Sequence, residues 1–225
     1  MKRACETEVR PARQSITSRY AGQTVLAIGA HPDDLEIGLG GTLAKLRKDN
    51  VRVVMCIASI PKDFDVRLAE AKRGAEILGC ELHLLMDGGP RRLEDVKTCD
   101  LVGMLDGVIR EYNPAAVFTH SSSDFHSDHL LIYKACLPTQ RLSYFDLFSY
   151  HPTNCRPVPT EFHAKAYVDI TETIDAKMHS ITAHASQFGG RGLDTEMYRE
   201  HAHMQGRMIG VPYAEGLDVL RMLLN

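Results

Sequence analysis

The first group of residues able to do chemistry is His31-Pro32-Asp33-Asp34, which directly follows the apolar run 24–29. Proline holds the residue before it in an extended conformation, and negative side chains are favoured at the start of a helix. His31 and Asp34 are of the types that bind a catalytic metal, and Asp33 is free to accept a proton. The plainer interpretation is a capped helix start with exposed acids. A histidine directly before two acids and after a buried strand favours the functional interpretation.

The second group is the segment DFHSDH at 124–129, which follows another apolar run and a short serine-rich loop. His126 and His129 are three residues apart, so on a helical turn both can reach one centre. Asp124 and Asp128 are placed to orient these imidazoles by hydrogen bonding. Chance clustering is the alternative, since the chain has 11 histidines. Two acid–histidine groups, each behind a strand, favour a functional site.

Together the two groups predict a catalytic metal centre. Three protein ligands with one open position are typical of a catalytic zinc site. His31 and Asp34 supply two ligands, and either His126 or His129 supplies the third, since the spacing alone does not say which. The other histidine is then available to act as an acid or to stabilise developing negative charge.

The elements that must position these groups alternate along the chain. Strands are predicted from apolar runs at 24–29, 51–57, 82–85, 115–118 and 166–170. Helices are predicted from apolar periodicity at 68–78, 101–109 and 173–185. This alternation predicts an α/β fold with a mostly parallel sheet and helices on both faces. Ligands of such sheets bind at the carboxyl ends of the strands, where both groups lie.

The composition indicates one ordinary globular domain, since 44% of the 225 residues are apolar and 24% are charged. A net charge of −3 without a basic cluster argues against nucleic acid as a partner. The apolar runs are too short to span a bilayer. Six scattered cysteines without a C-x-x-C pair indicate reduced thiols, as in a cytoplasmic protein.

The domain is predicted at 23–225, preceded by a tail at 1–22 that lacks the apolar core of a secretion signal. The proline-rich segment 151–160 is predicted to be an irregular loop. Glu36 is either a support of the site or an exposed acid. Seven other histidines are interpreted by default as surface or hydrogen-bonded structural residues: His120, His151, His163, His179, His184, His201 and His203. Three glycines would let a ligand or the next strand approach the backbone closely: Gly38, Gly40 and Gly41.

The segments GAHPDDLEIGLGGTLAKL at 29–46 and DFHSDH at 124–129 resemble the two signature motifs of the LmbE-like, or PIG-L-like, zinc-dependent N-acetylglucosaminyl deacetylase family. The resemblance spans most of the chain from about Val25 and continues in five further places: Arg67-Leu68-Ala69-Glu70, Leu78-Gly79, Lys177, His184-Ala185-Ser186-Gln187 and Tyr213-Ala214-Glu215. It implies a Rossmann-like α/β fold that binds Zn²⁺ at the strand ends, although Fe²⁺ or another divalent metal would also fit. It further implies removal of an N-acetyl, or other N-acyl, group from a glucosamine-containing molecule.

The resemblance also implies roles by motif position. The implied metal ligands are His31, Asp34 and His129. The implied general base is Asp33, and His126 is similar to the residue that stabilises the oxyanion or protonates the leaving amine. Arg67 lies where the family places a substrate-contacting arginine. Asp124 occupies a position that is tyrosine in some members, which predicts different transition-state contacts there.

Two other classes of protein share some of these features. A non-catalytic nucleotide- or sugar-binding module would have no use for Asp33 and would place a glycine loop directly after Ile28. A non-haem iron oxygenase shares two histidines and a carboxylate, but that chemistry usually occurs in an all-β barrel.

The resemblance leaves the acceptor molecule unnamed. A free amino sugar, a nucleotide sugar, a thiol precursor, an antibiotic intermediate and a glycan all fit a small N-acetylated substrate. Some family members form trimers or hexamers, which makes a homo-oligomer an open expectation here.

Overall fold

The computed structural model describes residues 15, 17–150, 162–189 and 194–224. The proline-rich segment 151–160 and most of the predicted tail lie outside the described residues. Of the predicted tail, Ser18–Tyr20 forms a short 3-10 helix. Tyr20 is buried, and its hydroxyl donates a hydrogen bond to Asp146 over 2.8 Å. This part of the predicted tail therefore packs against the domain.

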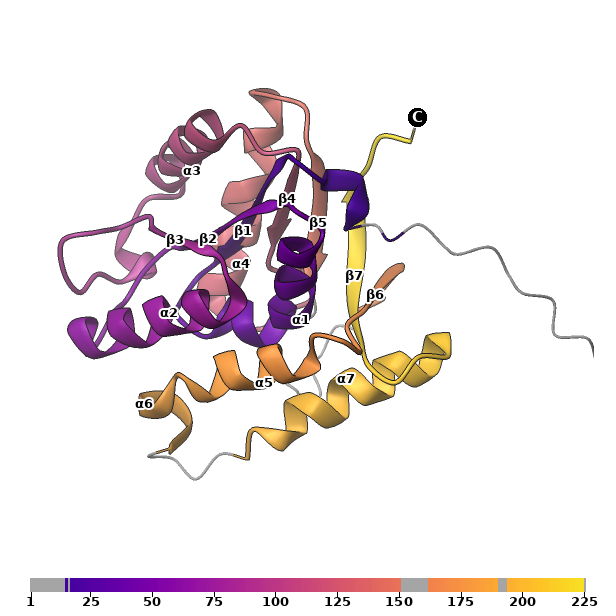
Figure 1. The fold of residues 1–225 in the computed structure, drawn as a ribbon. Helices are drawn as coiled ribbons and strands as arrows, with labels where there is room; N and C mark the ends of the chain where they lie inside the picture. Colours follow the sequence, from indigo (N-terminus) through magenta and orange to yellow (C-terminus); the bar gives the residue numbers. More distant parts are fainter. Residues whose placement is uncertain (1–14, 16, 151–161, 190–193, 225) are drawn as a thin grey trace, which may run out of the picture.

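Within the described residues, seven strands form one sheet in the order β3-β2-β1-β4-β5-β7-β6 (Figure 1). The strands are β1 (Thr24–Gly29), β2 (Arg52–Ile57), β3 (Glu81–Leu84), β4 (Ala116–Thr119), β5 (Asp146–Tyr150), β6 (Ala166–Asp169) and β7 (Ala214–Arg221). The first five strands in this order, from β3 through β2, β1 and β4 to β5, pair in parallel. Strand β7 is antiparallel to both of its neighbours. The prediction of a mostly parallel sheet is therefore confirmed.

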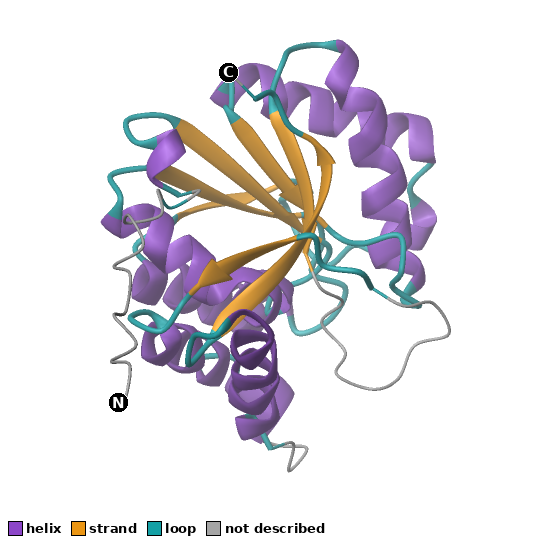
Figure 2. Cartoon of the chain, turned by 90° about the vertical axis from the view of Figure 1, so that its right-hand side faces the viewer, coloured by secondary structure: helices purple, strands orange, loops and turns teal. Residues whose placement is uncertain are grey.

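Helices cover both faces of the sheet, as predicted (Figure 2). The helices packed against one face are α1 (Asp34–Lys48), α2 (Phe64–Leu78), α5 (Ile174–Thr182), α6 (Ala185–Phe188) and α7 (Glu196–Ile209). Those against the other are α3 (Thr98–Tyr112) and α4 (Ser127–Cys136). Strand β1 contributes Val25 and Ala27 to the first layer and Leu26 and Ile28 to the second. Burial on both faces explains why its sequence is continuously apolar.

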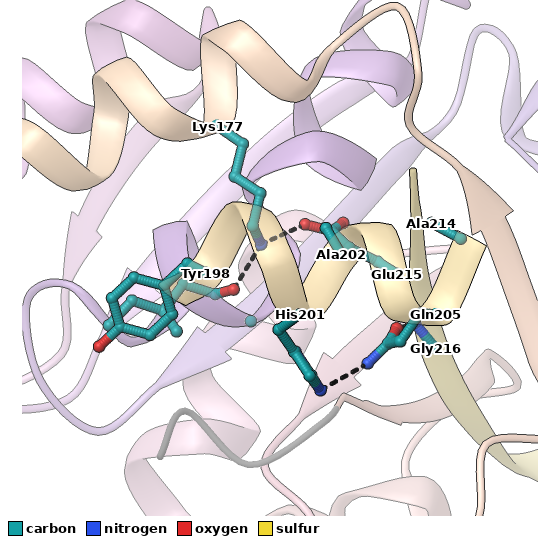
Figure 3. Close-up of a pocket in the computed structure, with 10 residues that line it drawn as sticks. Lys177, Tyr198, His201, Ala202, Gln205, Ala214, Glu215 and Gly216 are labelled. Atoms are coloured by element: carbon teal, nitrogen blue, oxygen red, sulfur yellow. Dashed lines mark hydrogen bonds and ion pairs between the residues drawn. The ribbon is translucent and has the colours of Figure 1, made fainter. Parts of the chain in front are cut away.

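Helix α1 carries the first chemical group and is fixed closely to its neighbours. A Cβ at Gly38 would lie 2.5 Å from the ring of Tyr150 on β5, so glycine here lets that side chain pack against the backbone of α1. Figure 3 shows Lys177 of α5 and Glu215 of β7 pointing toward each other, and the two form a buried ion pair. The Glu215 carboxylate also accepts hydrogen bonds from the backbone of α1, at Gly41 and Thr42.

The described helices include none with the length and apolar character needed to cross a membrane. Four cysteines in the described part of the chain are free thiols: Cys56, Cys80, Cys99 and Cys136. Burial raises the pKa of the Cys56 thiol to about 12, as expected for a small apolar core residue.

Candidate active site

The two acid–histidine groups meet at one edge of the sheet. Strands β1 and β4 are parallel neighbours, so their carboxyl ends lie side by side. His31 follows β1 directly before α1, and His126 immediately precedes α4 in the connection after β4. The sequence prediction that both groups lie at the carboxyl ends of the strands is confirmed.

Asp34 is the centre of this cluster and is buried. One carboxylate oxygen lies 3.3 Å from Nε2 of His129. The other accepts the backbone N–H of His31 over 2.8 Å and lies 3.8 Å from Nδ1 of the same residue. Burial alone would raise the pKa of Asp34, but the positive charge of His129 and hydrogen bonding to that ring lower it well below its usual value. Asp34 is therefore ionised.

Two further carboxylates orient the imidazoles of His31 and His129. Asp128 lies 3.0 Å from Nε2 of His31, and Asp124 lies 2.7 Å from Nδ1 of His129. Each ring therefore uses one nitrogen to contact a carboxylate and turns the other toward Asp34. Such support fixes both the ring orientation and the tautomer of a metal-binding histidine.

The positive charge of His129 is stabilised from both sides. Burial by itself lowers the pKa of this imidazole, but Asp34 and Asp124 together raise it to about 10. Asp34 and Asp124 thus compensate one buried cation. A divalent metal between Asp34 and His129 would replace the same positive charge, and its binding would release the imidazole proton.

The donor atoms fit a divalent metal. Two sets of three side chains have ligand atoms within 4.8 Å of one another: His31, His126 and His129, and Asp34, His120 and His129. The expected set of His31, Asp34 and His129 takes members from both. Its imidazole nitrogens and carboxylate oxygen are the ligands of catalytic zinc sites, and the orienting carboxylates leave these atoms free to bind.

His120 was interpreted as a surface or structural histidine, and the structure places it inside the site. Its ring is fully buried and stacks on His129 at 4.0 Å between centroids. Its Nε2 accepts the backbone N–H of Ala30 over 2.9 Å, so that lone pair is not free for a metal. Burial and the nearby charge of His129 lower the pKa of His120 to about 4, which keeps the ring neutral. His120 therefore packs against His129 and does not offer Nε2 as a ligand. Its position immediately after β4 was the one feature of the sequence that could have placed it at the site.

Asp33 precedes α1 with a backbone φ of 94°, in the left-handed region. A residue other than glycine is strained there, and such strain is concentrated at functional sites. Burial, followed by the negative charge of Asp34, raises the pKa of Asp33 to about 7. Its carboxylate lies 3.5 Å from the guanidinium of Arg67. A carboxyl group with a pKa near neutrality is suited to accept and release a proton.

His126 lies at the exposed side of the cluster and caps α4. Its Nδ1 accepts the backbone N–H of Asp128 over 3.2 Å, and its ring stacks on His129 at 4.5 Å between centroids. Partial burial, then the charges of His129 and His31, lower the pKa of His126. The neutral form of the ring is therefore favoured near neutral pH. Since Nδ1 is an acceptor, the neutral ring carries its proton on Nε2 and remains a hydrogen-bond donor.

Arg67 lies on the first turn of α2 and is only 8% exposed. Its guanidinium donates to the backbone carbonyl of Pro32 over 2.8 Å and contacts Asp33. The structure thus brings Arg67 to the site, against the main chain of the first motif. The substrate contact predicted for Arg67 stays a prediction.

Comparison with known proteins agrees with this geometry. The family model described as PIG-L, GlcNAc-PI de-N-acetylase, matches residues 26–139. The diacetylchitobiose deacetylase of Thermococcus kodakarensis is 30% identical over 221 residues, which cover 86% of this chain and 81% of that protein. The region matched by the family model contains both acid–histidine groups and Arg67.

Solved structures show the same fold. The conserved protein TT1542 from Thermus thermophilus superposes with a TM-score of 0.74 at 25% identity, covering 89% of this chain and 96% of that one. GalB, the 4-carboxy-2-hydroxymuconate hydratase of Pseudomonas putida, also superposes with a TM-score of 0.74, at 21% identity, covering 90% of this chain and 98% of that one. The fold alone therefore does not decide the reaction. The match to the family model and the similarity to the deacetylase over most of both chains do decide the family: this chain belongs to the PIG-L family of de-N-acetylases.

Proposed function

We propose that this protein is a metal-dependent deacetylase that hydrolyses the N-acetyl amide of an amino sugar or a related glucosamine-containing small molecule. The observation that carries the proposal is the position of Asp33 and His126 beside the donor set of His31, Asp34 and His129. A non-catalytic binding module has no use for a strained acid with a raised pKa at that place. The similarity to a diacetylchitobiose deacetylase supports an amino-sugar substrate.

The metal would be held by Nδ1 of His31, a carboxylate oxygen of Asp34 and Nε2 of His129. Zn²⁺ is the proposed ion, because a set of two imidazoles and one carboxylate is typical of catalytic zinc. A bound divalent metal polarises a carbonyl group and makes a neighbouring water more acidic. Asp124 and Asp128 keep the two imidazoles oriented, as their 2.7 and 3.0 Å contacts indicate.

The remaining side chains divide the proton transfers and the charge stabilisation. Asp33 accepts the proton of the water that attacks the amide carbon. His126 donates a hydrogen bond from Nε2 to the carbonyl oxygen as negative charge develops there. Asp33 then holds the proton that the departing amine requires. Because the His126 ring is neutral, its part in this scheme is hydrogen bonding to the oxyanion.

A screen for acetate release tests the proposal. N-acetylglucosamine, diacetylchitobiose, nucleotide-linked N-acetylglucosamine and N-acetylated glycosides are incubated with the protein, with and without added zinc. Metal-dependent release of acetate from at least one of them is the expected result. The absence of release from all of them, with hydration of an unsaturated acid in its place, would assign the protein to the reaction class of GalB.

The purified protein should bind about one divalent metal per chain after zinc loading, because the three donors form a single site. Elemental analysis of zinc-loaded protein measures this directly. Removal of the metal by a chelator should also lower the unfolding temperature, since a ligand that binds only the folded state stabilises it. Zinc-loaded protein without bound metal would contradict the proposed centre.

Phe125 is expected to contribute to substrate binding. Its side chain is 50% exposed between two residues of the site, Asp124 and His126. An apolar face of a sugar ring that covers it would bury roughly 40 Å² of apolar surface, worth about 1 kcal/mol. Phe125→Ala should therefore raise KM about fivefold and leave kcat nearly unchanged. Tyr144→Ala, at an equally exposed aromatic residue near the opposite edge of the sheet, is the control and should change neither value.

A cytoplasmic location remains part of the proposal. The free thiols in the described part of the chain support it, because exposed cysteines such as Cys99 are uncommon in oxidising compartments. Gel filtration with light scattering would determine whether the protein forms a trimer or hexamer.

A further inference from the structure

Behind the site lies a buried pair, Glu36 and His184, that the proposed reaction does not use. Both residues are fully buried, and Oε1 of Glu36 lies 2.9 Å from Nε2 of His184. Burial alone would lower the pKa of His184, but the hydrogen bond to Glu36 and the charges of Glu36, Asp33 and Glu70 raise it. Glu36 is thus a buried support, and the interpretation of His184 as an internally hydrogen-bonded histidine is confirmed.

Helix α2 lies directly over this pair. A Cβ at Gly74 would lie 2.3 Å from Oε1 of Glu36 and 3.3 Å from Nε2 of His184. No real side chain tolerates the first distance, so glycine is required for α2 to approach the pair. The pair is therefore enclosed between α1, α2 and the junction of α5 and α6.

The same helix connects the pair to Asp33. Arg67 lies two turns before Gly74 on the buried face of α2 and donates to the carbonyl of Pro32 over 2.8 Å. Glu70, one turn after Arg67, accepts hydrogen bonds from both the backbone N–H and the hydroxyl of Ser186, over 2.7 and 2.6 Å. The segments 67–70 and 184–187 of the sequence thus meet each other beside the first motif.

Building on the proposed role of Asp33 as the base, we propose that the Glu36–His184 pair, with Arg67 and Glu70 of α2, positions the Asp33 carboxylate. Asp33 has a strained left-handed backbone, which persists only where its surroundings fix it. Arg67 holds the carbonyl before Asp33 and contacts its carboxylate. The buried pair fixes the distance between α1 and α2. This distance in turn determines how close the guanidinium of Arg67 lies to Asp33.

A purely structural role would be served better by apolar side chains. Three buried atoms of this network have no hydrogen-bond partner within the described residues: Oε2 of Glu36, Nδ1 of His184 and Nε of Arg67. Each such atom costs stability, and native structures retain few of them without a functional reason. Charges of Arg67, His184 and Glu36 all act on the Asp33 carboxyl group, which places the network within electrostatic reach of the base.

Substitution of His184 tests the proposal. His184→Ala should lower kcat about 10- to 100-fold, the usual effect of removing an outer support of a catalytic group. KM and bound zinc should remain near the parent values, because no substrate or metal contact is removed. His184→Gln, whose amide can still donate to Glu36, should restore much of kcat. His179→Ala, at an exposed histidine on the preceding helix α5, is the control and should behave like the parent.

A second variant keeps the proposal testable if His184→Ala fails to fold. Gly74→Ala retains all four side chains of the network but forces Oε1 of Glu36 to move. The overlap should lower stability whatever the pair does, but if the pair were purely structural, the kcat of the folded variant would be unchanged. The proposal predicts a reduced kcat with zinc still bound. Parent-like kcat in both Gly74→Ala and His184→Ala would overturn it.

Crystal structures of the parent and His184→Ala separate this proposal from the proposed function. The expected change is that Asp33 leaves the left-handed region and that Arg67 loses its bond to Pro32. This readout does not depend on a substrate. If the parent releases no acetate, the proposed function fails, and the backbone of Asp33 alone decides the positioning role. An unchanged Asp33 in the variant would overturn that role.

Discussion

Replacing Asp33 with asparagine is expected to lower kcat about 10²- to 10⁴-fold, the range that general acid–base catalysis contributes. Asparagine has the same shape and tolerates the left-handed backbone of this position better than alanine does. It cannot accept the proton of the attacking water, however. Metal content should equal that of the parent, because the ligand atoms of Asp34 and the two histidines are unchanged. Kinetics and elemental analysis on the same preparation measure both quantities.

Asp34→Asn is the matched variant, since it makes the same chemical change one residue later. Asp34 accepts the backbone N–H of His31 and contacts His129, so its carboxylate belongs to the donor set. Asp34→Asn should lose metal affinity first and activity as a consequence. If both variants lost metal equally, the division of roles between the adjacent acids would be wrong. If Asp33→Asn kept its kcat, Asp33 would not be the base.

The sequence predicts at which end of the strands the site lies, because this depends only on the residues that directly follow each strand. A histidine and two acids followed an apolar run, and a second acid–histidine group followed another. In a parallel sheet both must lie at the carboxyl ends of strands. The structure adds that β1 and β4 are direct neighbours, which no local pattern could show. That adjacency brings His129 of one motif to within 3.3 Å of Asp34 of the other.

Strands β5 and β7 and helix α7 are among the elements that the sequence did not predict. Strand β7 contains Glu215, Gly216 and Asp218 within eight residues, and its burial comes from pairing with β5 and β6 on both sides. Helix α7 is rich in histidines, methionines and charged residues and has few aliphatic side chains. The antiparallel pairing of β7 is likewise a tertiary outcome. The alternation of apolar runs and helices does not predict a strand that follows the last helix and inserts between two earlier strands.

The positions of several residues in and beside the site likewise follow from tertiary packing. His120 looks like any histidine at a strand end, and its position follows from packing against His129 and Tyr150. Glu36 and His184 are 148 residues apart in sequence and meet only because α1 and α5 pack together. The neutrality of His126 depends on its partial burial and on the charges of His129 and His31, and His31 comes from the other motif.

His126 and His129 provide the sharpest test of the mechanism, because their hydrogen-bond partners differ although they are three residues apart. His129 turns Nε2 toward Asp34 and is held by Asp124, whereas His126 caps α4 and is exposed. His129→Ala should therefore lose its metal and with it essentially all activity. His126→Ala should keep its metal and bind substrate nearly normally. Its kcat should fall about 10²- to 10³-fold, the usual result of removing one oxyanion donor.

The capping role of His126 requires its own control, since loss of a helix cap costs about 1 kcal/mol of stability. His126→Asn restores a side-chain acceptor for the backbone N–H of Asp128 but is too short to offer a donor where Nε2 lies. It should unfold at nearly the temperature of the parent and still show the low kcat of His126→Ala. Recovery of kcat in His126→Asn would mean that the cap, and not the donor, is what catalysis requires. A metal-free His126→Ala beside a metal-replete His129→Ala would mean that the two histidines have exchanged the roles assigned here, with His126 as the ligand and His129 as the donor.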